Sequence, residues 1–541
     1  MREVTRRGLL RGVGRAAAAT AGVAAGAAGL SSLAGCSEND GGGAGNGSAT
    51  ARPADVRTGN PITRENREAG SRGWMSADRG ATPVTDDLSQ IKAFADTTSV
   101  THGEQIAFHV ATAAPQSYTV AVYRMGHYGG AGGRLLTTSP KQRGQQQPAP
   151  EVDGPNGTVR TSWQPSWSLE IPRDWVSGLY LASFTTERGE RTAVPFAVRD
   201  DSRASTFLVV LPFNTYQAYN QYPFDGTLGR SLYYGFLPSA TDPAAGAKAP
   251  DGHTYPAEPV ARQRYVRHYP QRSRAVSFRR PYQHDGMPAE FALDLAFVSW
   301  AEREGWDVTY ATNLDLHEGR VVPSRHQALL FSGHDEYWSQ EMRQTVEQGV
   351  AGGLSLATFA ANDCYWKVRI DRDPTGFPLM TCYKTDPDPI HDPTGPTTFW
   401  RRAAPNGALA EQRLLGGQYT GAVVGTFPLT VSTATHWFWQ GTDLIDGDFL
   451  PDLVSGEADG QQRGVPLPAA SEHLLLSDSQ FRAAGRSRMQ QQNTTLYRAT
   501  AGGWVFNAGT FGWALALGGG PKLEIPQAQI ATRNLVTRLK A

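Results

Sequence analysis

Between residues 87 and 200, apolar and polar positions alternate in short stretches. A period of two residues places successive side chains on opposite faces of a β-strand. The stretches that alternate in this way are residues 91–95, 105–111, 118–124, 167–171 and 178–184. Glycine, proline, asparagine and aspartate fill the gaps, as they do in turns. The pattern predicts an immunoglobulin-like β-sandwich over residues 87–200, without the cysteine pair of antibody domains.

From about residue 205 the pattern changes to continuous apolar runs that alternate with helical spacing. A continuous apolar run typical of a strand buried on both faces occurs at residues 206–212, and further strands are predicted at 308–312, 328–332 and 354–359. Helices are predicted over residues 289–304 and 339–352, the second with Ser339 as N-cap. Residues 436–439 and 504–510 are predicted to be strands that return to the same sheet. The alternation predicts a doubly wound α/β domain over residues 201–541, and therefore a multidomain protein that combines an all-β and an α/β part.

The N-terminus carries three ordered export features. Arg6-Arg7 forms a twin-arginine motif, a weakly apolar stretch follows from residue 16 to 30, and residues 33–36 resemble a lipobox that ends at Cys36. Together they predict a signal peptide over residues 1–35, a lipid on Cys36 and a flexible tether and N-terminal extension over 36–86. The expected location is extracytoplasmic, anchored to the cell membrane. The alternative is an alanine-rich leader with a chance arginine pair.

Composition narrows the class of partner. The 541 residues contain 51 Lys+Arg and 51 Asp+Glu. Residues 1–35 hold five arginines and one glutamate, so their removal leaves an excess of four negative charges. Such a balance excludes bulk nucleic-acid binding, which needs a basic surface. After Cys36 only Cys364 and Cys382 remain, and sequence leaves both a disulfide and two buried thiols open.

Polar and aromatic side chains follow three of the predicted α/β strands directly. They occupy residues 211–220, 332–338 and 360–366, and ligands in open α/β sheets bind outside the carboxyl ends of the strands. His334 and Glu336 are two residues apart, so in extended chain they face one metal ion or substrate. The alternative is a structural loop in which Glu336 counters a helix N-terminus. Ser355 is predicted to lie inside a strand, where it cannot serve as an exposed nucleophile.

Several motifs together resemble the large (beta) subunit of bacterial N,N-dimethylformamidase. They are Tyr219-Asn220, Ser277-Phe-Arg-Arg-Pro-Tyr282, Gly333-His-Asp-Glu-Tyr-Trp-Ser339, Asn362-x-x-Tyr-Trp-x-x-Arg369, Tyr123-Arg-Met-Gly and Gly178-Leu-Tyr. The resemblance covers roughly residues 85–520. It implies a β-sandwich followed by an α/β domain that resembles class I glutamine amidotransferases. The position of the amidotransferase cysteine reads Ala360-Ala361-Asn362, so the usual nucleophile is absent.

The resemblance also implies a site. Tyr219, Tyr282 and Glu336 would hold a single ferric iron, since phenolate and carboxylate are hard oxygen donors. His334 and Glu457 would transfer protons, and Asn220 and Asn362 would line the substrate pocket.

The function that these observations predict is iron-dependent hydrolysis of the C–N bond of a linear amide. The substrate would be a small molecule, the membrane partner would be reached through Cys36, and a small partner subunit or a homo-oligomer stays open. The alternative is a non-catalytic cell-envelope binding lipoprotein that retains the fold. A third candidate is an envelope enzyme that acts on polysaccharide, prompted by the aromatic residues near the site.

Overall fold

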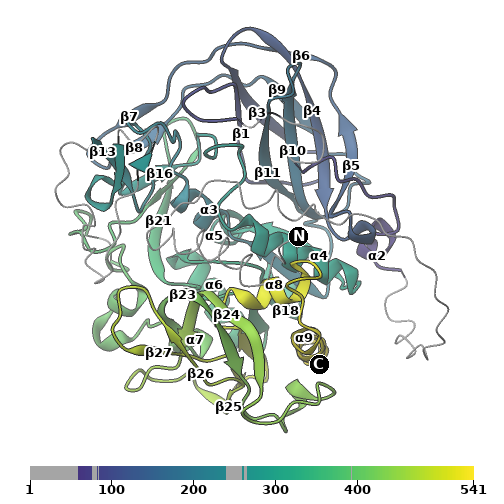
Figure 1. Ribbon diagram of the computed structural model, residues 1–541, viewed down its shortest axis with the longest axis vertical. Helices are drawn as coiled ribbons and strands as arrows, with labels where there is room; N and C mark the ends of the chain where they lie inside the picture. The colour runs from purple at the N-terminus through teal and green to yellow at the C-terminus, as the bar shows by residue number, and fades with distance from the viewer. Residues whose placement is uncertain are drawn as a thin grey trace, which may run out of the picture.

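The structure is a computed structural model that describes residues 59–75, 82, 84–238, 259–260, 265–391 and 393–540. In Figure 1 the strands of the first 200 residues lie at the top and the C-terminal half lies at the bottom, with helices between them. The predicted signal peptide and Cys36 fall outside the described residues. None of the helices in the described part of the chain has the length and apolar character needed to span a membrane.

The N-terminal part is a sandwich of two antiparallel sheets. One sheet contains β1 (Ile91–Ala95), β3 (Gln105–Thr112) and β9 (Trp167–Glu170). The other contains β2 (Ser99–Val100), β11 (Arg191–Val198), β10 (Gly178–Thr186), β4 (Gln116–Met125), β5 (Gly133–Thr138) and β6 (Gln142–Gly144), with only β2 pairing in parallel. The ring of Phe108 packs between the sheets, 5.4 Å from Phe184 and 5.9 Å from Phe196. The predicted strands are confirmed, and the immunoglobulin-like assignment stays a prediction.

A seven-stranded mixed sheet forms the centre of the second part. Its order is β17 (Val308–Thr312), β12 (Phe207–Leu211), β18 (Ala328–Phe331), β20 (Ser355–Thr358), β29 (Trp504–Asn507), β28 (Thr495–Ala499) and β25 (Ala470–Leu475). The first five strands are parallel, as predicted, and β28 and β25 add antiparallel pairs at one edge. The expected likeness to glutamine amidotransferases stays a prediction.

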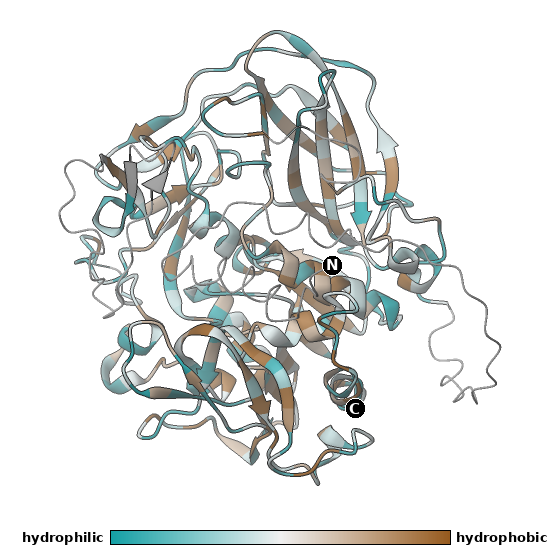
Figure 2. Ribbon diagram, in the orientation of Figure 1, coloured by the Kyte–Doolittle hydropathy of each residue, from teal (hydrophilic) through white to brown (hydrophobic). Residues whose placement is uncertain are grey.

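Both faces of this sheet are buried, which explains the continuous apolar runs of its strands. Phe207, Val209 and Leu211 share one core with α4 (Phe291–Arg303), α8 (Gly512–Gly518) and α9 (Pro526–Leu539). Leu208 and Val210 point the other way and share a core with α5 (Asn313–His317), α6 (Gln340–Ala351) and α7 (Gln412–Leu415). Figure 2 shows hydrophobic residues gathered on the strands and on α4 and α8.

The remaining elements surround this core. They are α2 (Pro61–Glu65), α3 (Phe213–Tyr219), β7 (Glu151–Asp153), β8 (Thr158–Arg160), β13 (Gly235–Pro238), β14 (Pro259–Val260), β15 (Tyr265–His268), β16 (Ala275–Ser277), β19 (Tyr337–Ser339), β21 (Trp366–Arg372), β22 (Pro378–Thr381), β23 (Gln418–Thr430), β24 (Phe449–Gly460), β26 (Ser479–Arg482) and β27 (Met489–Gln492). Short 3-10 helices are η4 (Tyr128–Gly130), η6 (Tyr269–Gln271), η7 (Pro323–Arg325), η8 (Trp400–Arg402), η9 (Pro405–Gly407) and η10 (Trp437–Trp439).

Both predicted helices and one of the two predicted returning strands are confirmed. Ser339 caps α6 and accepts a hydrogen bond from the backbone N–H of Met342 at 3.3 Å. The strand predicted over residues 436–439 is wrong, because His436 caps η10 by accepting from the Phe438 N–H at 3.4 Å and so turns the chain. Cys364 and Cys382 are both buried and free, so the disulfide alternative is not formed.

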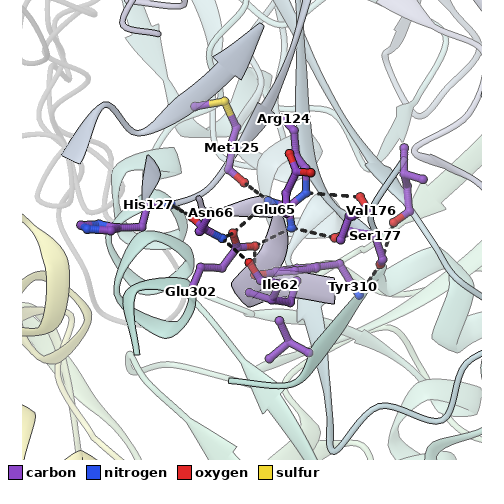
Figure 3. Close-up of polar contacts among 12 residues, drawn as sticks. Ile62, Glu65, Asn66, Arg124, Met125, His127, Val176, Ser177, Glu302 and Tyr310 are labelled. Atoms are coloured by element: carbon purple, nitrogen blue, oxygen red, sulfur yellow. Dashed lines mark hydrogen bonds and ion pairs between the residues drawn. The ribbon is translucent and has the colours of Figure 1, made fainter. Parts of the chain in front are cut away.

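A buried polar cluster joins the sandwich to the α/β part (Figure 3). We call it the junction cluster, and it contains Glu65, Asn66, Arg124, Tyr128, Glu302 and Tyr310. Arg124 on β4 donates to both carboxylate oxygens of Glu302 on α4, at 2.7 and 2.9 Å. Asn66, just after α2, and Tyr310 on β17 also donate to Glu302, at 2.7 and 2.9 Å. The cluster therefore fixes the sandwich and the N-terminal segment 59–75 against the central sheet.

Candidate active site

The candidate site lies at the carboxyl ends of three neighbouring parallel strands, where ligands of open α/β sheets bind. Tyr219 ends α3, which follows β12, while His334 and Glu336 follow β18. Asn362 lies in the loop after β20, and Glu457 lies on β24. The sheet therefore brings together side chains that are more than 200 residues apart in the sequence.

Two phenols meet the carboxylate of Glu336. Tyr219 donates its hydroxyl to Oε2 at 2.6 Å, and Tyr233 donates its hydroxyl to Oε1 at 2.7 Å. The two rings are stacked, with centroids 4.7 Å apart and planes 8° from parallel. Glu336 and Tyr233 are buried, whereas Tyr219 keeps a partly exposed edge. Each oxygen of one carboxylate thus faces one phenol oxygen.

Tyr282, the second tyrosine that the resemblance suggested, lies elsewhere. Its ring packs edge-on against Tyr216, with centroids 6.5 Å apart, and it lines a hollow between the sandwich and the α/β part. Within the described ranges, no hydrogen bond or ring contact joins Tyr282 to Tyr219 or Glu336. Tyr233 takes the place expected for it. No sequence signal marked Tyr233, because it lies in a segment without periodic pattern before β13.

On the other side of Glu336 lies an imidazole among three acids. The Nε2 atom of His334 is 3.4 Å from Glu457 Oε2 and 3.7 Å from Glu336 Oε2. Its Nδ1 atom is 2.6 Å from Oε2 of Glu290, the residue that precedes α4. Sequence reasoning missed Glu290, which had no motif around it.

Asn362 links the two carboxylates of the site. Its Nδ2 donates to Glu457 Oε2 at 2.8 Å and to Glu336 Oε1 at 3.2 Å. The backbone of Asn362 has φ of 59°, a left-handed conformation that costs free energy for a residue with a Cβ. Its N–H is held by Asp459 Oδ1 at 2.8 Å. This backbone conformation, which asparagine enters more readily than most residues with a Cβ, and the hydrogen bond to Asp459 together hold the Asn362 amide between the two carboxylates.

Asn220, the other predicted pocket residue, turns away from Glu336. Its Nδ2 donates to Gln217 Oε1 at 2.7 Å and to the carbonyl oxygen of Pro281 at 2.8 Å. Asn220 therefore ties the end of α3 to the loop that carries Tyr282. In this structure its amide supports the Tyr219 segment from behind.

Burial and neighbouring charges shift the pKa values of the site in opposite directions. Burial and then the charge of Glu336 raise the pKa of Tyr219 well above its usual range. Burial raises the pKa of Glu457 to about 8, although His334 opposes the rise. For His334 burial alone would lower the pKa, but Glu290 and Glu457 together raise it to about 10. At neutral pH the imidazole is therefore protonated, and Glu457 is close to its titration point.

A buried lysine lies behind the phenols. Lys384 Nζ is 3.4 Å from the centroid of the Tyr233 ring and 4.1 Å from that of Trp366. It donates to the hydroxyl of Tyr337 at 2.8 Å. This positive charge lies against the face of one of the phenols that contact Glu336, and it was not predicted from the sequence.

Seven of the residues described above are connected through Glu336 and His334, and we call this group the site cluster. They are Tyr219, Tyr233, Glu290, His334, Glu336, Asn362 and Glu457. Across the described part of the chain, no group of three or more histidine, cysteine, aspartate and glutamate side chains is arranged to hold a metal ion. A metal held here would need the phenol oxygens as ligands.

A family model described as N,N-dimethylformamidase beta subunit-like, C-terminal, matches residues 119–527, about three quarters of the chain. The chain belongs to this family. The match confirms the resemblance that the sequence motifs indicated. The matched range also includes every residue of the site cluster.

Other comparisons add no functional information. No curated protein matches the chain. Among solved structures, one match is a cycloisomaltooligosaccharide glucanotransferase from Paenibacillus sp. complexed with cycloisomaltoheptaose, at 8% sequence identity and a TM-score of 0.17. The match covers 54% of this chain and spans 57% of the Paenibacillus chain. A likeness this weak carries no argument about fold or activity.

Proposed function

We propose that this family member hydrolyses the C–N bond of a small amide, with an iron ion held by Tyr219, Tyr233 and Glu336. The observation that carries the proposal is the convergence of the two phenol oxygens on the two oxygens of Glu336, at 2.6 and 2.7 Å. The family name supports an amide such as N,N-dimethylformamide as substrate. The same name, which refers to a beta subunit, is compatible with a partner subunit.

The three side chains fit a ferric ion by their chemistry. Phenolate and carboxylate are hard, anionic oxygen donors, which a highly charged hard cation prefers. Both phenols now share their protons with one buried carboxylate, and a cation would replace those protons with compensating positive charge. When bound, the ion supplies Lewis-acid polarisation of the amide carbonyl. This ligand set differs from the one that the motifs suggested, since Tyr233 replaces Tyr282.

The remaining residues of the site cluster suit the two proton transfers of amide hydrolysis. Glu457, in the fraction of molecules in which it is ionised, accepts a proton from the attacking water as the C–O bond forms, so turnover should rise as pH approaches 8. His334, protonated at neutral pH, donates the proton on Nε2 to the amide nitrogen as the C–N bond breaks. The proton held by Glu457 can then return to His334 across the 3.4 Å between them, so the products are a carboxylic acid and an amine.

Access to the reaction centre fits this arrangement. Tyr219 is partly exposed, while the neighbouring Glu336, His334 and Glu457 are buried. Burial excludes bulk water, which strengthens each electrostatic interaction around the reacting amide. Export by the twin-arginine route and a lipid on Cys36 remain part of the proposal, because folded export suits a protein loaded with its metal beforehand.

The proposal is tested on protein purified without chelators. We expect close to one equivalent of iron and a visible tyrosinate-to-ferric charge-transfer band, together with release of dimethylamine from N,N-dimethylformamide. Tyr233→Phe should lose the band and the activity. Tyr282→Phe is the matched control and should keep both.

Two results would contradict the proposal. Less than a tenth of an equivalent of any metal in active protein would remove the metal-dependent reaction. Loss of the band in Tyr282→Phe, with its retention in Tyr233→Phe, would return the ligand set to the one that the motifs suggested.

A further inference from the structure

Glu290 occupies an unusual position just before α4. Its backbone adopts φ 65° and ψ 3°, in the left-handed region that residues with a Cβ rarely enter. It stands at the N-cap of α4, yet its side chain makes no capping hydrogen bond. The usual reason for an acidic residue at this position, satisfaction of the free N–H groups of the first turn, therefore does not apply.

The carboxylate of Glu290 is directed to one partner. Oε2 lies 2.6 Å from Nδ1 of His334, and the two side chains are 6% and 1% exposed. Oε1 is buried without a hydrogen-bond partner in the part of the chain that the structure describes, and neither oxygen pairs there with a lysine or arginine. A carboxylate buried in this way costs free energy, so its retention needs a reason beyond packing.

The first turn of α4 holds the segment around His334 with a second acid. Asp294 accepts hydrogen bonds from Ser332 and from Tyr216, the latter at 2.5 Å. A Cβ on Gly333 would lie 2.7 Å from the Asp294 carboxylate, so only glycine fits there. The backbone before His334 is thus fixed by Asp294, which leaves Glu290 to fix the imidazole itself.

We propose that Glu290 is a positioning residue: it holds the His334 ring with Nδ1–H toward Oε2, so that Nε2 faces Glu336, Glu457 and Asn362. This inference rests on the proposed function for its catalytic consequence. Carboxylates paired with the far nitrogen of a histidine fix its tautomer and orientation in hydrolases and metal sites. Glu290 acts through His334 and does not touch the reacting atoms.

The orientation is tested first without any catalysis, on the metal-free protein. A short N–H···O bond to a carboxylate moves the imidazole proton far downfield in ¹H NMR. We expect one such resonance in the wild type, coupled to a histidine ¹⁵N, and its loss in both His334→Gln and Glu290→Gln. Asp294→Asn, on the same turn, is the control and should keep it. Persistence of the resonance in Glu290→Gln, or its absence from the wild type, overturns the proposal.

The catalytic consequence is tested with two substrates of different leaving group, N,N-dimethylformamide and 4-nitroformanilide. An alkylamine must be protonated as it leaves, whereas a nitroanilide nitrogen needs less help. Glu290→Gln should lower kcat about 100-fold for the first and less than 10-fold for the second, with KM and iron content unchanged. Glu290→Asp, which keeps the charge, should recover part of the loss.

The outcomes separate the two proposals. An equal loss of kcat for both substrates, or a fall in iron content, would make Glu290 a structural residue and overturn the inference. If iron-loaded wild type hydrolyses neither amide, the proposed function fails, while the NMR comparison still decides whether Glu290 orients His334.

Discussion

The junction cluster and the site cluster are both buried and both rich in carboxylates and tyrosines, and each takes one acid from α4 or its N-cap, Glu302 and Glu290, yet they balance charge in opposite ways. In the junction cluster Arg124 meets Glu302 through two parallel hydrogen bonds, at 2.7 and 2.9 Å, and neutral donors complete the carboxylate. In the site cluster the His334 imidazole lies between Glu290, Glu336 and Glu457, and no lysine or arginine of the described residues forms an ion pair with Glu290 or Glu336.

The difference distinguishes a polar core that serves the fold from one that serves a reaction. A buried pair whose donors and acceptors are matched costs little to keep once formed. An excess of buried acid is tolerated only where a function requires it, since it lowers stability until a proton or a cation arrives. The excess of acid in the site cluster therefore fits the cation that the proposed function assigns to it.

The largest expected effect comes from Glu336→Gln. Removing this carboxylate takes away one proposed iron ligand and the acceptor of both phenol hydroxyls, so kcat/KM should fall about 10⁴-fold, equivalent to about 5.5 kcal/mol. The metal-free variant should be no less stable than the wild type, because the substitution removes one of the excess acids. Amine release measures the fall in kcat/KM, and thermal unfolding of the same preparations measures the stability.

Asp335→Asn is the comparison variant for Glu336→Gln. Asp335 is the buried neighbour of Glu336, and it accepts hydrogen bonds from Asn313 and Trp338 instead of phenols. The Asp335→Asn variant should retain iron. A large fall in the unfolding temperature of metal-free Glu336→Gln would show that the site cluster is held together as tightly as the junction cluster, and the contrast between them would fail.

For the junction cluster we expect the opposite result, a loss of stability without a loss of activity. Glu302→Gln leaves the Arg124 charge buried without compensation, which should lower the free energy of unfolding by about 3–5 kcal/mol. Iron content and turnover per folded molecule should not change. Denaturant unfolding followed by circular dichroism measures the loss.

A paired substitution controls for the loss of packing. Arg124→Met combined with Glu302→Leu removes both charges at similar volume, and it should recover most of the stability lost by Glu302→Gln. If the double variant is as unstable as the single one, the hydrogen bonds from Asn66 and Tyr310 stabilise the junction cluster, and the ion pair contributes little.

Glu457 of the site cluster should contribute to the pH dependence of stability, together with the buried Asp294, Asp335 and Asp459, whose pKa values burial also raises. Burial raises the pKa of Glu457 to about 8, so folding binds a proton that the unfolded chain, with a carboxyl pKa of 4.5, releases. The contribution is therefore present below about pH 4.5 and is lost as pH rises toward 8. Glu457 alone should account for a loss of about 2 kcal/mol in metal-free protein between pH 5 and pH 7. Glu457→Gln should reduce the slope by that share, measured by urea unfolding at each pH.

A surface acid provides the reference for that slope. Glu187 is exposed and paired with Lys141, and the pair lowers its pKa, so its effect has the opposite sign and is screened by solvent. Glu187→Gln should leave the fall between pH 5 and pH 7 in place. An unchanged slope in Glu457→Gln would place the source of the pH dependence outside the site cluster.

The strands and helices that periodic patterns predicted are the parts that local physics decides. Residues 207–211 read as a strand buried on both faces because two cores enclose them, and Ser339 marked the start of α6 because its side chain caps that helix. The segment at 436–439 failed because a side chain to backbone bond from His436 overrides the β preference of three aromatic rings.

The site could be predicted where motifs follow strands, and at Glu457 on β24 through the family resemblance. His334, Glu336 and Asn362 come directly after β18 and β20, so the sheet brings them together and a sequence pattern can mark them. Tyr233 and Glu290 are brought to the site by tertiary packing alone. A phenol or carboxylate that reaches the site from a non-periodic segment leaves no local signal, which is why the motifs indicate Tyr282 and give no sign of Tyr233.

The smallest effect is expected from Tyr310→Phe, which tests how completely the polar groups of the junction cluster are hydrogen-bonded. Tyr310→Phe removes a hydroxyl that donates to Glu302 Oε1 at 2.9 Å, an oxygen that also accepts from Arg124. Because the carboxylate keeps its ion pair, the loss should be about 1 kcal/mol in the free energy of unfolding, with iron content unchanged. Tyr233→Phe makes the same chemical change at Glu336 and also removes the acceptor of the Trp366 Nε1–H at 3.2 Å, so there we expect a similar small loss of stability together with loss of metal. Equal losses of stability in the two variants, with equal iron, would mean that the two clusters do the same structural work and that the excess of acid around His334 has no ligand to serve.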